Sequence, residues 1–175
     1  MGKRSSGSFE RQKRDFYPTP FSAVEPLLSH LSEKTVFDEP CAGNGALVDH
    51  LESSGHRCLR ATDIEPQRDD VGTFDAFDIE SCYGDCFITN PPWNRKFLHP
   101  LILHLCDIAP TWLLFDADWM HTRQATEYLP YCKKIVSVGR VKWIPDSPHT
   151  GKDNAAWYLF YTRTENSPVD FWGRR

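Results

Sequence analysis

Cys86-Phe87-Ile88-Thr89-Asn90-Pro91-Pro92-Trp93 is the stretch around which the rest of the chain is predicted to be arranged. Its first four residues are apolar or β-branched, which is typical of a buried strand. The two prolines end that strand, because proline has no backbone N–H and its φ is fixed. The sequence therefore places an amide and an indole at the carboxyl end of a strand, where ligands bind in open α/β sheets.

A strand–helix–strand unit lies upstream of this stretch. Residues 35–40 are expected to form the first strand, residues 46–54 a helix that ends near Gly55, and residues 57–62 the second strand. A tight glycine loop, residues 41–45, joins the first strand to the helix. Such a unit predicts parallel strands with a right-handed crossover.

The remaining segments continue this pattern. Apolar side chains at helical spacing predict helices at residues 23–32 and 96–108, and a short helix is expected at residues 121–129. Further strands are expected at residues 73–78, 86–90, 112–116, 134–138 and 155–162. The chain is thus predicted to be an α/β protein with a mostly parallel sheet of seven strands and helices on both faces. The tail, residues 164–175, stays unassigned, although Phe171 and Trp172 could pack on the domain.

The composition is that of a soluble globular protein. Of the 175 residues 40% are hydrophobic and 25% are charged, which is enough for one domain with its own core. No apolar run approaches the roughly 18 residues of a membrane span, and the polar N-terminus does not resemble a secretory signal. The cysteines have no paired spacing, so we expect reduced thiols and a cytoplasmic protein. Cys82 and Cys86 could begin a metal site with His99 or His104, but the ligand set is incomplete and no metal is expected.

Charge is unevenly spread along the chain, although the net charge is only −4. Residues 1–14 carry five basic side chains against one acid and have no periodicity, so we expect a disordered basic arm. Residues 63–90 are strongly acidic, and residues 133–175 are basic. A basic face beside an acidic pocket is one interpretation, and an ordinary mixed surface is the other. The long loop 139–154 could either contact a phosphate backbone or be plain solvated loop, with candidate contacts at Lys142, Trp143, His149, Lys152 and Asn154.

The glycine loop and the acid after it predict a nucleoside site. Gly43 and Gly45 allow a ligand to approach the backbone closely, and the start of the next helix favours an anion. Asp63, at the end of the second strand, has the position of acids that bind ribose hydroxyls. Val48 replaces the third glycine of a dinucleotide fingerprint, and no P-loop lysine follows. We therefore expect a nucleoside ligand without a pyrophosphate, with a carboxylate near the helix N-terminus.

Four segments, in order, resemble the S-adenosylmethionine-dependent methyltransferases that act on amino groups, the N6-adenine DNA methyltransferases in particular. Residues 15–20 resemble the Tyr-Thr-Pro cofactor segment, and residues 39–45 resemble the glycine-rich first motif. Residues 63–65 resemble the acidic end of the second strand, and residues 90–93 the catalytic Asn/Asp-Pro-Pro-aromatic motif. Residues 78–79 match, more loosely, the segment that contacts the adenine of the cofactor. This order is that of the γ group, and the small size is similar to compact methylases of phages and prophages.

The resemblance implies a Rossmann-like class I methyltransferase fold, S-adenosylmethionine as cofactor and nucleic acid, most of all DNA, as partner. Residues 15–175 are expected to be one catalytic domain without the separate target-recognition domain that is usual in the γ group. The implied catalytic residues are Asn90, Pro91, Pro92 and Trp93. The implied cofactor contacts are Tyr17, Pro18, Thr19, Pro20, Glu39, Pro40, Cys41, Ala42, Gly43, Gly45, Asp63, Ile64, Asp78 and Ile79.

The expected chemistry is transfer of a methyl group to an exocyclic amine. The Asn90 side-chain oxygen and the Pro91 carbonyl can accept the hydrogens of that amine, while Trp93 stacks on the planar target. Adenine N6 in DNA is the leading target, and a base in a duplex would have to be flipped out. A ribosomal RNA base or a protein glutamine would suit the same geometry. A cofactor-binding module without activity is the alternative from another class, and the intact motif argues against it.

Overall fold

The computed structural model describes residues 17–144, 151–162 and 168–174, and within these one sheet of eight strands forms in the order β3-β2-β1-β4-β5-β7-β6-β8. Strands β1 to β5 are parallel to one another, β7 is antiparallel to both β5 and β6, and β8 is parallel to β6. This confirms the predicted mostly parallel α/β fold. The strands are β1 (Val36–Glu39), β2 (Arg57–Asp63), β3 (Gly72–Thr73), β4 (Cys86–Thr89), β5 (Thr111–Asp116), β6 (Cys132–Arg140), β7 (Asn154–Phe160) and β8 (Asp170–Trp172).

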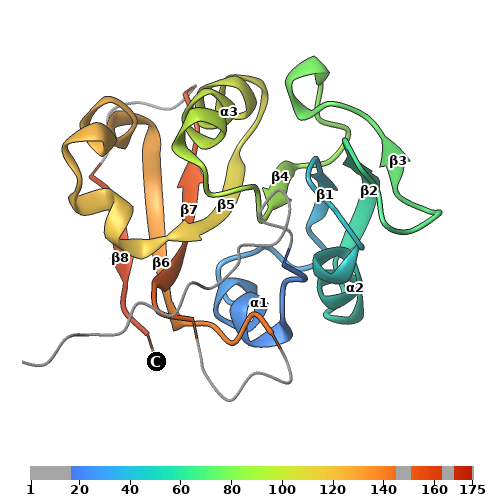
Figure 1. Ribbon diagram of the computed structural model, residues 1–175, viewed down its shortest axis with the longest axis horizontal. Coiled ribbons are helices and arrows are strands. Elements are labelled where there is room, and N and C mark those ends of the chain that lie inside the picture. Colours follow the sequence, from blue (N-terminus) through green and yellow to red (C-terminus); the bar gives the residue numbers. More distant parts are fainter. Residues whose placement is uncertain (1–16, 145–150, 163–167, 175) are drawn as a thin grey trace, which may run out of the picture.

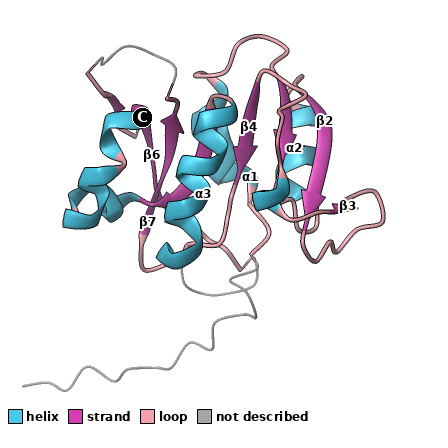
Figure 2. Ribbon diagram, turned by 90° about the horizontal axis from the view of Figure 1, so that it is seen from above, coloured by secondary structure: helices cyan, strands magenta, loops and turns pink. Residues whose placement is uncertain are grey.

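Helices cover both faces of the sheet, as predicted. Helices α1 (Phe21–Leu28) and α2 (Ala46–Ser53) lie on one face, and α3 (Arg95–Ile108) lies on the other (Figures 1 and 2). The apolar side chains of α1 and α2 share a core cluster with Phe37 of β1 and Ile88 of β4, whereas those of α3 pack against the opposite side of the sheet. The indole of Trp157 also donates a hydrogen bond to the carbonyl of Ala23, 2.7 Å away, which ties α1 to β7.

Two predicted elements were wrong. The expected strand at residues 73–78 is only the two-residue β3, because Asp75 accepts a hydrogen bond from the Phe77 N–H and starts a 3₁₀ turn over Ala76–Asp78. The expected helix at residues 121–129 is a series of short 3₁₀ segments. Thr122 has an extended backbone between two of these segments, so no continuous helix can form. The predicted helix at residues 23–32 begins two residues earlier and ends at Leu28.

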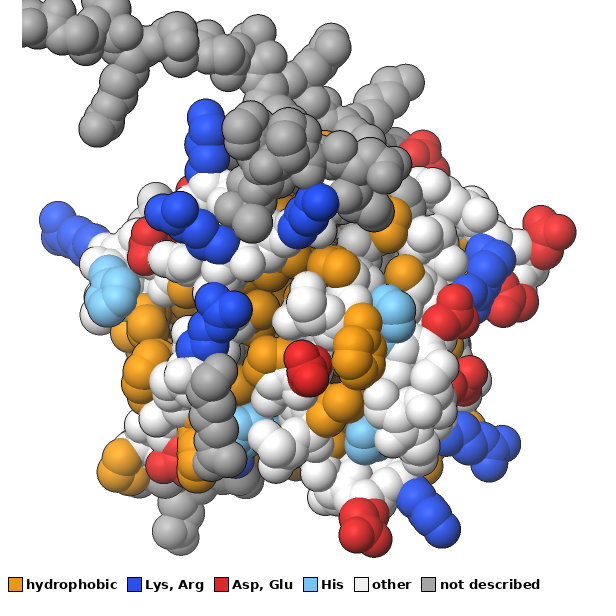
Figure 3. All heavy atoms as spheres, turned by 90° about the horizontal axis from the view of Figure 1, so that it is seen from below, with side chains coloured by type: hydrophobic (Ala, Val, Ile, Leu, Met, Phe, Trp, Pro, Cys, Tyr) orange, Lys and Arg blue, Asp and Glu red, His pale blue; other side chains and the backbone are white. Residues whose placement is uncertain are grey.

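The unassigned tail contains the eighth strand. In β8, Phe171 pairs with Ile135 of β6. Trp172 lies edge-on to His30, just after α1, with ring centroids 5.1 Å apart, while Phe171 is 58% exposed. Trp172 thus makes an edge contact with the body of the fold but is itself 41% exposed. Figure 3 looks onto the α1–α2 side, where hydrophobic side chains gather near the middle and most charged ones lie around the edge.

Some expectations fall on residues outside this description. They are the basic arm at residues 1–14, the first part of the Tyr-Thr-Pro segment at residues 15–16, and His149 in the long loop. None of the helices in the described residues is long and apolar enough to cross a membrane.

Candidate active site

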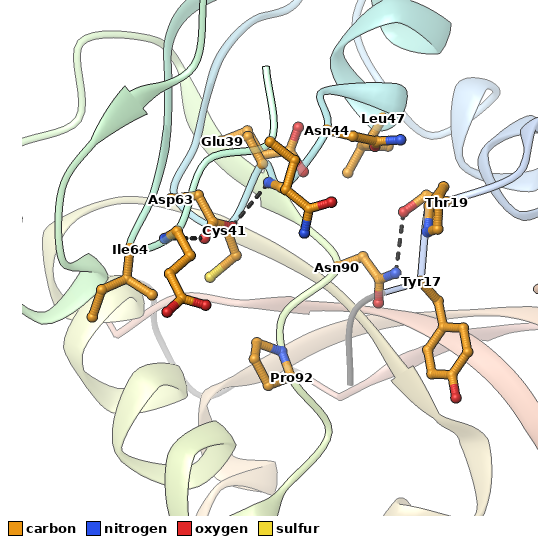
Figure 4. Close-up of a pocket in the computed structure, with 15 residues that line it drawn as sticks. Tyr17, Thr19, Glu39, Cys41, Asn44, Leu47, Asp63, Ile64, Asn90 and Pro92 are labelled. Atoms are coloured by element: carbon orange, nitrogen blue, oxygen red, sulfur yellow. Dashed lines mark hydrogen bonds between the residues drawn. The ribbon is translucent and has the colours of Figure 1, made fainter. Parts of the chain in front are cut away.

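A pocket opens where β1, β2 and β4 end, and all four sequence motifs contribute to it (Figure 4). Its empty volume is about 700 Å³, which includes open solvent at the mouth. The parallel strands explain the assembly, because their carboxyl ends meet at the same edge of the sheet. The lining residues are Tyr17, Pro18, Thr19, Glu39, Cys41, Ala42, Gly43, Asn44, Leu47, Asp63, Ile64, Glu65, Gln67, Asn90 and Pro92.

Some predicted site residues do not line this pocket: Pro20, Pro40, Gly45, Asp78, Ile79, Pro91 and Trp93. Asp78 is exposed, and Ile79 is buried in the core cluster beneath α3. Four lining residues were absent from the predicted set. Asn44 and Glu65 stand inside motifs that the sequence shows, whereas Leu47 and Gln67 carry no motif signal and depend on how the chain folds back.

The glycine loop has the conformation that its glycines predict. Gly43 and Gly45 have φ values of 54° and 74°, a left-handed region that is costly for other residues. The Asp63 carboxylate accepts hydrogen bonds from the N–H groups of Gly43 and Glu65, at 2.9 and 2.8 Å. Asp63 therefore braces the loop from the end of β2. A carboxylate has about four acceptor positions, so it retains the capacity to bind ribose hydroxyls.

Glu39 is the buried acid of the pocket, with only 2% of its surface exposed. Burial raises its pKa well above the ordinary value, and the nearby Asp63 carboxylate raises it further, while Arg68 opposes the shift. Within the described residues, its Oε2 atom has no hydrogen-bond partner. An unpaired buried oxygen is costly. This position therefore favours a ligand that brings a donor or a positive charge.

Asn90 is held at both ends of its side-chain amide. Its Nδ2 donates to the Thr19 hydroxyl at 3.1 Å, as drawn in Figure 4, and its Oδ1 accepts from Nε1 of Trp93 at 3.2 Å. The same indole N–H lies 3.1 Å from the Leu114 carbonyl of β5. Because an indole N–H can only donate, it fixes which end of the amide is the oxygen. The oxygen keeps a lone pair for a further donor.

Trp93 also contacts a second indole. Trp143, from the segment after β6, lies edge-on to it with ring centroids 5.6 Å apart and planes at 87°. The Gly151 N–H donates to the Val141 carbonyl at 2.8 Å, which joins the two sides of this segment near Trp143. The structure therefore brings Trp143, a candidate from the long loop, next to the Asn-Pro-Pro-Trp motif. Lys142, Lys152 and Asn154 are exposed.

Cys41 is the thiol of the pocket. Burial raises its pKa above the ordinary value, and the carboxylates of Asp63 and Glu39 raise it further. It is therefore a neutral thiol near pH 7 and a poor nucleophile. The described part of the chain contains no group of three or more His, Cys, Asp or Glu residues that could hold a metal ion.

Comparisons with known proteins identify the fold. No protein-family model matches the sequence, and no curated protein matches it. Solved structures do match. A dimethyladenosine transferase from Plasmodium falciparum has 14% identity and a TM-score of 0.53 over 83% of this chain and 62% of that chain. The 23S rRNA methyltransferase ErmE has 14% identity and a TM-score of 0.52, over 84% of this chain and 69% of that one.

A third similar structure is the methyltransferase subunit of a type I restriction-modification system from Streptococcus thermophilus. It has 9% identity and a TM-score of 0.58, over 90% of this chain and 47% of that chain. The chain thus spans less than half the length of that subunit. Identities this low show the fold, which is that of the class I S-adenosylmethionine-dependent methyltransferases.

Proposed function

We propose that the protein is an S-adenosylmethionine-dependent methyltransferase that acts on an exocyclic amine, most of all adenine N6 in DNA. The observation that carries this proposal is the Asn90 amide, which Thr19 and Trp93 hold in one orientation at the wall of the glycine-loop pocket. A polar group that is fixed in this way is suited to orienting an amine that enters beside the pocket.

The pocket residues fit this cofactor. S-adenosylmethionine carries positive charge on its sulfonium and amino groups, and three carboxylates, of Glu39, Asp63 and Glu65, line the pocket. The Oε2 atom of Glu39, which has no partner among the described residues, offers an acceptor to such a group. Asp63 would hold the ribose, and the apolar side chain of Ile64, which is 55% exposed, would cover part of the adenine. When bound, the cofactor supplies an electrophilic methyl group.

The residues of the chain would act mainly by orientation. The lone pair of an exocyclic adenine amine is delocalised into the ring, so the amine is a weak nucleophile. Acceptance of its hydrogens by Asn90 Oδ1 and the Pro91 carbonyl would localise that lone pair on nitrogen. The hydrogen bond that Asn90 Nδ2 donates to the Thr19 hydroxyl keeps the amide from turning its NH₂ group toward the amine. This mechanism needs no strong base, because electrostatic preorganisation supplies the stabilisation.

The two indoles would hold the planar target. Trp93 contacts Asn90 and Trp143 contacts Trp93, and stacking of a base on an aromatic side chain is worth roughly 1–3 kcal/mol. A target in a duplex would have to be flipped out of the stack, whereas an unpaired base would not.

DNA is the favoured substrate because the order of the four motifs resembles the γ group. RNA is the second candidate, because the similar structures include a 23S rRNA methyltransferase and a dimethyladenosine transferase.

The test is transfer of a labelled methyl group to double-stranded DNA, single-stranded DNA, ribosomal RNA and a protein extract in parallel. We expect N6-methyldeoxyadenosine in the DNA digests and far less of it with the Asn90→Ala variant. Label found in RNA or on glutamine would show that RNA or protein, and not DNA, is the substrate. Absence of label in all four would overturn the proposal.

A further inference from the structure

Arg68 lies outside the pocket and connects two of its walls. One wall is the segment 64–71, and the other is the glycine loop with the start of α2. Arg68 follows β2 in the segment 64–71, which supplies the lining residues Ile64, Glu65 and Gln67. Its Nη1 lies 2.6 Å from the Asp49 carboxylate of α2, and its Nε lies 2.5 Å from the Asp70 carboxylate. The side chain therefore connects the segment after β2 to the helix after the glycine loop.

The same guanidinium lies against the glycine loop. A Cβ atom on Gly45 would collide with the guanidinium carbon of Arg68, so the arginine fills the space that a side chain there would need. Gly43 and Asn44, next to it in the loop, face the pocket. The Gln67 N–H also donates to the Gly43 carbonyl at 3.0 Å. The loop is thus held between the segment 64–71 and α2.

We propose that Arg68 is a positioning residue for the cofactor: it fixes the segment 64–71 against the glycine loop and α2, so that both walls are set for one nucleoside ligand. Arg68 does not line the pocket itself and acts through Gly45, Asp49 and Gln67. This inference rests on the proposed function, because it needs a cofactor that touches both walls.

Global stability is a weaker explanation for this arrangement. The side chains of Arg68, Asp49 and Asp70 are 32%, 56% and 67% exposed. Solvent screens ion pairs of this kind, so they contribute little to the stability of a whole domain. Their effect should therefore be local, on the geometry of the loop and the segment that they connect.

The experiment measures S-adenosylmethionine affinity by calorimetry, and the melting temperature, for the full chain and four variants. We expect Arg68→Gln to weaken the affinity about tenfold, as when a group that orients binding residues is removed. Arg68→Lys should recover part of the loss, because it keeps the charge but cannot bond two carboxylates in a fixed plane. Arg57→Gln, at the opposite end of β2, is the matched control and should bind normally.

A double variant separates positioning from general damage. If Arg68 acts through Asp49, the Asp49→Asn/Arg68→Gln chain should bind no more weakly than Arg68→Gln alone. Wild-type affinity in Arg68→Gln would overturn the inference. A large drop in the melting temperature of Arg68→Gln, together with no recovery of cofactor affinity in Arg68→Lys, would also overturn it. Failure of the unmodified chain to bind S-adenosylmethionine would overturn the proposed function, which is a different result.

Discussion

The indole N–H of Trp93 points at the side-chain oxygen of Asn90, 3.2 Å away, within the turn that follows β4. Trp93 therefore does more than offer an aromatic surface. It fixes the orientation of the Asn90 amide and, through the Leu114 carbonyl, links the turn to the neighbouring strand β5. Thr19 holds the other end of the same amide from a segment 71 residues away.

Trp93→Phe tests the role of this hydrogen bond. Phenylalanine keeps an aromatic ring but loses the N–H, and a neutral hydrogen bond contributes about 0.5–1.5 kcal/mol. We expect the methyl-transfer rate to fall about 2- to 10-fold, with unchanged cofactor affinity. Trp143→Phe is the matched control, because it makes the same change at the neighbouring indole and leaves the hydrogen bond between Trp93 and Asn90 in place. Equal rates in Trp93→Phe and the unmodified chain would show that the hydrogen bond is not used.

Asn90→Ala should separate catalysis from cofactor binding. Removal of an oriented polar group at a reacting centre typically costs roughly 100- to 1000-fold in rate. We expect a loss of this size in single-turnover transfer, while calorimetry still detects S-adenosylmethionine binding. Thr19→Val should give a smaller loss, because it keeps the Asn90 amide and removes only the hydroxyl that accepts a hydrogen bond from its NH₂ group. Full turnover by Asn90→Ala would refute the catalytic assignment.

Asp63→Asn should weaken cofactor binding. An asparagine offers one acceptor oxygen instead of two, so a backbone N–H of Gly43 or Glu65 loses its partner. Hydrogen bonds to a charged group contribute about 1.5–3 kcal/mol, so an affinity loss of roughly 10- to 100-fold is expected. Calorimetry measures it, with the melting temperature recorded to detect unfolding. Unchanged affinity would contradict a ribose contact from Asp63.

The pKa of Glu39 predicts a pH-dependent stability. Burial raises this pKa in the folded chain well above its ordinary value of 4.5. The protonated form thus favours the fold, and its contribution is lost as the pH rises from about 4.5 through the raised pKa. Glu39→Gln resembles the protonated form, so its advantage in melting temperature over the unmodified chain should grow with pH. If the two chains respond equally to pH, Glu39 is not the group responsible.

The variant Glu39→Gln also tests the cofactor site in the opposite direction. A bound cation favours the ionised carboxylate, so the unmodified chain should bind S-adenosylmethionine more tightly as the pH rises through the Glu39 pKa. The glutamine variant should show weaker binding without this pH dependence. Stability and binding would then change in opposite senses, which a general effect on folding would not produce.

Deletion of residues 1–14 tests the basic arm that the sequence predicts. Each phosphate neutralised by Lys or Arg contributes to the decrease of nucleic-acid affinity with salt, and the arm carries five such side chains. We expect the salt dependence of DNA binding to become shallower and the cofactor affinity to stay the same.

Because phosphate contacts carry no base information, sequencing of methylated DNA should show loose sequence preference. Modification confined to one long palindrome would contradict that.

Much of the site could be predicted because it depends on short-range patterns. The glycine loop, Asp63 and Asn90 all follow strands, and parallel strands bring such residues to one edge. Gln67 and Arg68 could not be predicted, because their contacts depend on how the segment after β2 folds back over the loop. The Trp93 hydrogen bond was also missed, since one of its acceptors, Leu114, is set by the pairing of β4 with β5.

The errors in the fold have a similar cause. The strand expected at residues 73–78 stops at Thr73, because Asp75 caps a 3₁₀ turn and the pairing with β2 ends there. The three residues of β8 are too few to show a period, and only their pairing with β6 makes them a strand.

The position of β8 has a practical consequence for handling the protein. A chain shortened before residue 168 would leave β6, an interior strand, with one row of unpaired backbone groups facing water. Such edges recruit strands from other molecules and promote aggregation. Arg174, after β8, also lies close to Gly139 near the end of β6. Shortened chains for expression trials should therefore keep β8 and Arg174.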